Sequence, residues 1–164
     1  MTGGGVTLRP ATEADYDFMR RLYASTREAE MAHFPFDETQ KQAFLEQQFA
    51  AQFAHYGIHY PTCERSIIEH SGAPVGRLWI DEWADQIRLV DIALTPECRD
   101  RGIGSTLLRQ VMDRGAKAGK PVTIHVEGFN PALSLYRRLG FEHVDTNGVY
   151  FLMRWTPTSA SASS

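Results

Sequence analysis

The sequence has no long apolar stretch and very little cysteine. No apolar run approaches the roughly 18 residues that a membrane-spanning helix needs, so we expect no membrane partner. Its first residues contain neither a charged nor an apolar segment, so we expect no signal peptide. The two cysteines, Cys63 and Cys98, cannot build a disulfide framework and form no Cys-x-x-Cys pair. These absences favour a cytoplasmic protein.

The sequence also lacks an excess of basic residues and a recognisable metal motif. Its formal net charge is −3, whereas binding nucleic acid through bulk charge requires a basic face, so we expect no nucleic-acid partner. There is no His-Glu-x-x-His motif and no Cys/His cluster. His55 and His59 are four residues apart, but Gly57 between them is expected to break the helix. We therefore expect no metal.

What is present is an alternation of strand and helix patterns over the length of one domain. We expect that domain at residues 6–155, with flexible termini at 1–5 and 156–164. The patterns predict strands at 6–9, 66–69, 74–83, 86–94, 122–126, 142–146 and 149–155. Helices are predicted after a capping box at Thr12, before Gly57, at or just after Gly102 and Gly104, and after Asn130, with an irregular acidic and aromatic segment at 25–38.

This order predicts an α/β (α+β) fold. The sheet is expected to be mixed and mostly antiparallel, with six to seven strands, a central parallel pair around a crossover helix, and about four flanking helices.

The most informative segment is the loop that follows the strand at 86–94. It contains Gly102 and Gly104, and a helix is expected to begin at or just after them. A helix start directs unpaired N–H groups and the positive end of its dipole at one point, and glycine lets a phosphate approach the backbone. The segment therefore predicts a diphosphate site. A P-loop does not fit because no lysine precedes Ser105, and a Rossmann motif does not fit because Leu107 replaces its third glycine.

Two motifs resemble those of one family. Arg99, Gly102 and Gly104 form the pattern Arg-x-x-Gly-x-Gly, which resembles the pyrophosphate loop of the GNAT superfamily of acetyl-CoA-dependent N-acetyltransferases. The segment 130–141 resembles that family's Asn-x-x-Ala-x-x-x-Tyr-x-x-x-Gly-Phe motif around Tyr136. Asn130 departs from the pattern because it lies six residues before the tyrosine and not seven, which favours a role as helix N-cap. The resemblance covers about residues 6–155.

The resemblance implies transfer of an acetyl group from acetyl-CoA to a primary amine, by direct attack in a ternary complex. It implies that Tyr136 protonates the departing thiolate of coenzyme A. It further implies strand-like pairing of the coenzyme's pantetheine arm with the backbone of the strand before the loop. The residues expected to bind the cosubstrate are Ile92, Ala93, Leu94, Arg99, Asp100, Arg101, Gly102, Ile103, Gly104, Ser105, Asn130 and Tyr136.

The residue that accepts the proton of the amine is open among several candidates. His125 ranks first because its unperturbed pKa of about 6.5 suits proton uptake at neutral pH. Asp91 ranks second because a carboxylate within an apolar strand needs a partner or a function. Glu82 ranks last, and a chain of water molecules with no single base is the fourth alternative.

The acceptor and the assembly state are also open. The family's acceptor wall implies Glu28, Glu30, Phe34, Phe36, Asp37 and the turn at Asn147–Gly148. Acids with aromatics indicate a cationic, partly apolar small-molecule or peptide amine, and a solvated acidic loop over core aromatics is the alternative. A homodimer is open as well. The competing functions are a catalytically inactive acyl-CoA-binding regulatory or scaffold module and, less favoured, a nucleotide-binding switch.

Overall fold

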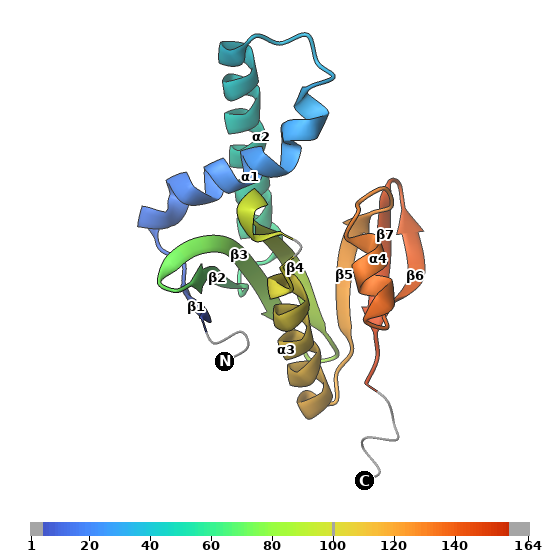
Figure 1. Ribbon diagram of the computed structural model, residues 1–164. Coiled ribbons are helices and arrows are strands. Elements are labelled where there is room, and N and C mark those ends of the chain that lie inside the picture. Colours follow the sequence, from blue (N-terminus) through green and yellow to red (C-terminus); the bar gives the residue numbers. More distant parts are fainter. Residues whose placement is uncertain (1–4, 100, 158–164) are drawn as a thin grey trace. The chain divides into compact units, whose positions relative to one another are not determined.

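The computed structural model of the protein describes residues 5–99 and 101–157. The expected flexible termini at 1–5 and 156–164 therefore lie almost entirely outside the described residues, as does Asp100. The described residues form seven strands, four α-helices and two short 3-10 helices (Figure 1). The strands are β1 (Val6–Pro10), β2 (Glu64–His70), β3 (Ala73–Glu82), β4 (Ile87–Leu94), β5 (Val122–Glu127), β6 (Glu142–Asn147) and β7 (Tyr150–Trp155). The α-helices are α1 (Tyr16–Met31), α2 (Glu38–His59), α3 (Ile103–Ala118) and α4 (Leu133–Arg138), and the 3-10 helices are Glu13–Asp15 and Pro96–Cys98.

The strands form one mixed sheet in the order β1-β2-β3-β4-β5-β7-β6. The β4–β5 pair is parallel, because α3 carries the chain from the end of one strand back to the start of the next. The β1–β2, β5–β7 and β6–β7 pairs are antiparallel. The predicted fold class is confirmed: a mostly antiparallel sheet with one central parallel pair and four helices.

The chain divides into two compact units, and β3 and β4 contribute residues to both. The first unit comprises the residues up to Leu78 together with Ile92–Arg99. Its core lies between α1 and α2, where the fully buried ring of Phe49 contacts the rings of Tyr16 and Tyr23 at centroid distances of 5.1 and 5.7 Å. Arg77 of β3 donates a hydrogen bond of 2.9 Å to Gln52, which ties α2 to the strand.

The second unit comprises Trp79–Asp91 and the residues that follow Asp100. Its two helices, α3 and α4, lie on the same side of the strands (Figure 1). A Cβ on Gly115 of α3 would lie 3.0 Å from Val122, and one on Gly140, just after α4, would lie 3.2 Å from Trp155. Val122 and Trp155 are register partners, so both helices cover the face that carries Val122, Ile124 and Val126.

Two helices are longer than the sequence predicts. The segment predicted to be irregular from Ser25 is helical as far as Met31, because Met31 is buried at the end of the α1 face formed by Met19, Leu22 and Tyr23. The predicted break at Gly57 is wrong, since α2 runs through it to His59. A glycine inside a helix costs only about 1 kcal/mol, which the packing of the rest of α2 offsets. None of the described helices is both long and apolar enough to cross a membrane.

Candidate active site

The start of α3 has the backbone geometry that an anion site requires. The helix begins directly after Gly102, as predicted, and Gly102 is left-handed with φ +82°. Among the described residues no side chain caps this end, and the N–H groups of Ile103, Gly104 and Ser105 have no partner within the helix. A Cβ on Gly102 would meet nothing within 4 Å, so the space beside the loop is open. Arg101 is exposed at the same end, and Asp100 lies outside the described residues.

Arg99 is engaged within the first unit. Its Nε donates to the carbonyl of Leu94 at 3.0 Å, and its Nη2 donates to the hydroxyl of Ser25 at 3.1 Å. The guanidinium thus joins the end of β4 to α1. The sequence predicts Arg99 as a phosphate ligand, and this tethering role depends on Ser25, which is 74 residues away and carries no local signal.

The last residues of β4, Ile92–Leu94, have one edge packed very closely. A Cβ on Gly76 of β3 would lie 2.3 Å from the carbonyl oxygen of Ala93, so only glycine fits there. Thr95, just beyond, donates from its N–H to the carbonyl of Val75 at 2.8 Å. On the other edge, the parallel ladder with β5 comprises, among the described residues, only Ile87–Leu89 of β4.

The helix α4 presents Tyr136 as a buried phenol. The residue is 4% exposed, and its ring meets Phe141 edge-on at a centroid distance of 5.6 Å. Gly140 has φ +105° and the N–H of Phe141 donates to the carbonyl of Tyr136 at 3.0 Å, so the predicted glycine cap that folds Phe141 back is confirmed. Within the described part of the chain, no group forms a hydrogen bond with the Tyr136 hydroxyl.

Asp91 and Tyr136 interact electrostatically. Burial, and then the negative charge of Asp91, raise the pKa of Tyr136 well above its ordinary value of 10. Asp91 is two and four residues after Leu89 and Ile87 in β4, so the three side chains point to the same face of the sheet. Ile87 and Leu89 are fully buried there. Its carboxylate therefore belongs to the sheet face that α3 and α4 cover. The phenol stays protonated at every physiological pH.

His125 lies on the opposite face of the sheet from Val122 and Ile124. Its Nδ1 is 3.2 Å from Nη1 of Arg88, and a guanidinium only donates, so Nδ1 accepts and Nε2 carries the hydrogen. Loss of solvation, and then the Arg88 charge, lower the pKa of His125, with partial opposition from Asp145. At neutral pH the imidazole of His125 is neutral, and the lone pair on its Nδ1 already accepts the hydrogen bond from Arg88.

The remaining two candidates have structural partners. Glu82 accepts hydrogen bonds from Arg114 at 2.8 Å and from Lys120 at 2.9 Å, and these cations lower its carboxyl pKa. Asn130 Oδ1 accepts from the N–H of Ala132 at 2.8 Å and so closes the turn before α4. The N-cap of α4 is Ala132, so the predicted role of Asn130 as N-cap of this helix is wrong.

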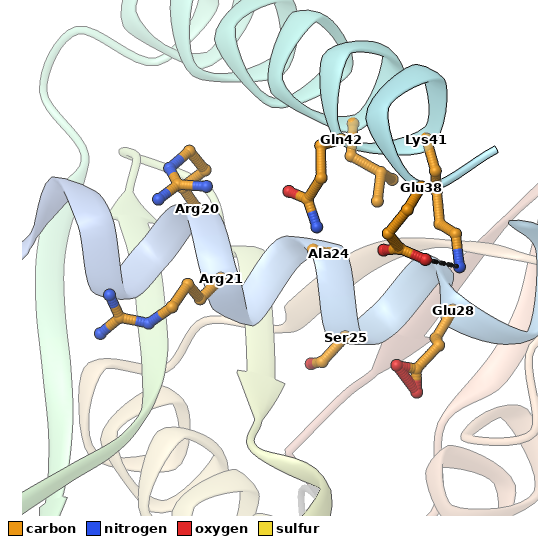
Figure 2. A pocket seen from close by; sticks show the side chains of 9 residues that line it. Arg20, Arg21, Ala24, Ser25, Glu28, Glu38, Lys41 and Gln42 are labelled. Atoms are coloured by element: carbon orange, nitrogen blue, oxygen red, sulfur yellow. Dashed lines mark ion pairs between the residues drawn. The ribbon is translucent and has the colours of Figure 1, made fainter.

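A groove of about 210 Å³ lies between α1 and α2 in the first unit. In Figure 2 side chains of both helices face it, with the ion pair of Glu38 and Lys41 at one end. Its lining residues are Arg20, Arg21, Ala24, Ser25, Glu28, Glu38, Lys41, Gln42 and Leu45.

Among the acids named as acceptor candidates, Glu28 is the one that lines this groove. Glu30 pairs with Arg27 at 2.9 Å, and Asp37 caps α2 by accepting from the N–H of Gln40. Phe34 and Phe36 stack at 5.6 Å beyond the end of α1.

Comparison with known proteins identifies the class. The family model described as "Acetyltransferase (GNAT) family" matches residues 18–141, and the chain belongs to this family. The resemblance that the two motifs indicate is thereby confirmed.

The relatives include one curated protein and many solved structures. The chain is 33% identical over 84 residues to the mycothiol acetyltransferase of Saccharomonospora viridis, an alignment that spans 48% of this chain and 23% of that protein. It is similar in structure to the PaiA N-acetyltransferase of Thermoplasma acidophilum in complex with coenzyme A, with a TM-score of 0.70, 18% identity, and coverage of 92% of this chain and 98% of that one. A GNAT family acetyltransferase from Elizabethkingia anophelis with acetyl-CoA bound gives a TM-score of 0.60 at 17% identity, covering 93% and 98% of the two chains. At these identities the structural likeness shows the fold.

Proposed function

We propose that this acyltransferase, acting as one domain over residues 6–155, moves an acetyl group from acetyl-CoA to a primary amine by direct attack in a ternary complex. The observation that carries the proposal is the buried phenol of Tyr136, which has no protein hydrogen-bond partner within the described residues. The ring is buried, whereas the hydroxyl is not among the fully buried polar atoms without a partner, so it is open to a bound molecule and we assign it to the substrate.

The diphosphate of acetyl-CoA would bind at the start of α3. The N–H groups of residues 103–105 supply donors, and the helix dipole and Arg101 supply positive charge. The left-handed turn at Gly102 and the open space beside it fit an anion that touches the backbone. The pantetheine arm would pair with the backbone of Ile92–Leu94. In this proposal Arg99 holds the end of β4 against α1.

The chemistry is divided between two side chains of the second unit. The amine nitrogen attacks the thioester carbonyl carbon, the carbon–sulfur bond breaks, and the sulfur takes the Tyr136 proton. The amine gives up a proton to Asp91, directly or through water. Removing that proton from a lysine-type amine at pH 7 costs about 4.6 kcal/mol, so a nearby carboxylate lowers the barrier. The raised pKa of Tyr136 keeps its proton in place until the sulfur departs.

Asp91 thereby replaces His125 as our preferred base. The Nδ1 lone pair of His125 already accepts from Arg88, and its lowered pKa disfavours proton uptake at neutral pH. His125 also belongs to the sheet face opposite the one that carries Asp91. We assign His125 a structural role on its own face of the sheet, as the hydrogen-bond partner of Arg88.

The acceptor amine would bind beside the α1–α2 groove, with Glu28 as partner for its positive charge. The groove is next to the end of β4 within the first unit, because Ser25 lines it and accepts from Arg99. The Glu28→Gln variant is expected to raise the acceptor KM while leaving acetyl-CoA affinity unchanged. Glu30→Gln is the matched control, since Glu30 pairs with Arg27.

The test of the whole proposal has two parts. Calorimetry with acetyl-CoA, ATP and NAD should show binding of acetyl-CoA alone. A thiol-release assay over polyamines, aminoglycosides, amino acids and peptide N-termini should then show release that depends on one class of amine. Absence of acetyl-CoA binding would refute the site, and binding without amine-dependent release would refute the transferase mechanism.

A further inference from the structure

Two histidines, His55 and His59, lie near the C-terminal end of α2, on either side of the helix break that the sequence predicts at Gly57. Because the helix does not break at Gly57, His55 and His59 are separated by four residues, slightly more than one turn and about 6 Å along the axis. Their ring centroids are 4.1 Å apart and the rings are inclined by 38°. Both side chains are exposed.

The ring nitrogens of both histidines are available to a ligand. Within the described residues, no hydrogen bond or ion pair involves either imidazole; their contacts are with each other and between His55 and Tyr56. The nearest cationic side chain to Gly57, Arg65, approaches from the Gly57 side of the helix, with Nη2 3.7 Å from a Cβ placed there. Position 57 is about 200° around the helix from both histidines, so that charge faces away from them.

We propose that His55 and His59 chelate one divalent transition-metal ion such as Zn²⁺, Ni²⁺ or Cu²⁺. Two imidazole nitrogens bound to one ion, each about 2.0–2.1 Å from it, lie roughly 3 Å apart, which rings at this centroid separation reach by small side-chain rotations. Water completes the coordination, since the described residues contain no group of three or more His, Cys, Asp and Glu side chains able to hold a metal.

Two features of the site favour a cation of this class. Imidazole nitrogen binds Cu²⁺, Ni²⁺ and Zn²⁺, whereas Mg²⁺ and Ca²⁺ prefer oxygen ligands. His59 is the last residue of α2, where the helix dipole is negative and stabilises positive charge. The ion would join two successive turns and hold the end of the helix against fraying. It has no part in acetyl transfer.

The experiment uses the full chain without an affinity tag. Isothermal titration with Zn²⁺ and Ni²⁺ should give one ion per chain, with no heat from Mg²⁺ or Ca²⁺. At a hundredfold excess over Kd, Zn²⁺ should raise Tm by roughly 5–11 °C. His55→Ala and His59→Ala should each weaken binding about tenfold or more, because one ligand remains. His33→Ala and His70→Ala, at other exposed histidines of the first unit, should change nothing.

Two further variants test the pairing itself. Gly57→Ala should keep or tighten binding, since it favours the helix and its Cβ meets only the end of Arg65. Ala51→His in the His59→Ala background recreates a pair four residues apart on exposed positions and should restore binding. The proposal is overturned if no saturable binding occurs below about 1 mM, if the alanine variants bind like the natural chain, or if Ala51→His restores nothing.

Discussion

The Tyr136→Phe substitution isolates one hydroxyl group at the proposed reacting centre. The folded protein should tolerate it, because within the described residues the hydroxyl has no hydrogen bond to lose and the ring contact with Phe141 remains. We expect the free energy of unfolding to change by less than about 1 kcal/mol, or roughly 2–4 °C in Tm. The affinity for acetyl-CoA should stay within about twofold, since the diphosphate and the pantetheine arm bind elsewhere.

The loss of rate should be large. A hydrogen bond from a buried phenol to a developing thiolate is charge-assisted and is worth about 1.5–3 kcal/mol, which corresponds to roughly 10- to 150-fold in rate. Proton transfer from a positioned acid contributes about 10²- to 10⁴-fold in total. We therefore expect kcat to fall by about 10²- to 10⁴-fold. Because the pKa of Tyr136 is raised, the natural protein should show no alkaline loss of kcat from this group below pH 10.

The assay is steady-state thiol release with the best amine from the screen, together with calorimetry for acetyl-CoA. Tyr150→Phe is the matched control, since that tyrosine is 46% exposed on β7 of the same unit and should keep full activity. A kcat within about threefold of the natural protein would refute the role of Tyr136 as acid. A parallel loss of acetyl-CoA affinity and Tm would instead assign it to packing.

The remaining predictions concern the anion site and the charged residues. Gly102→Ala should strain the left-handed turn by about 1–2 kcal/mol and weaken acetyl-CoA binding at least tenfold. Gly119→Ala, at φ +69° on the other end of α3, should cost similar stability without loss of affinity. Equal acetyl-CoA affinities of the two variants in calorimetry would contradict this. Asp91→Asn should lower kcat, while His125→Gln should keep most activity. The opposite order in rate assays would return His125 to the role of base. Because the pKa of His125 is lowered on folding, its contribution to stability is complete above about pH 6.5 and is lost as the pH falls, so urea unfolding should show the natural protein weakening relative to His125→Gln between pH 7 and pH 5. Glu82→Gln should remove two surface ion pairs, with a small drop in Tm and an unchanged kcat.

Local chemistry determined much of the fold and part of the site. The turn at Gly102, the cap at Gly140 and the capping box at Thr12 each depend on residues within a few positions of one another, so the sequence alone predicted them correctly. For the same reason, the period of apolar residues predicted where the strands and the crossover helix lie along the chain. The hydrogen bond of Asn130 to Ala132 is local too, but it closes the turn before α4 and does not cap the helix.

The tertiary structure decided what depends on distant partners. Arg88 reaches His125 from 37 residues away and uses its lone pair, and Ser25 engages Arg99 from 74 residues away; neither pair has a sequence signal. The helix through Gly57 exists because packing of α2 outweighs the local cost of glycine, which a sequence pattern cannot weigh. Sequence therefore determined which backbone turns form, and the packing of remote strands and helices determined which side chains are left free to act.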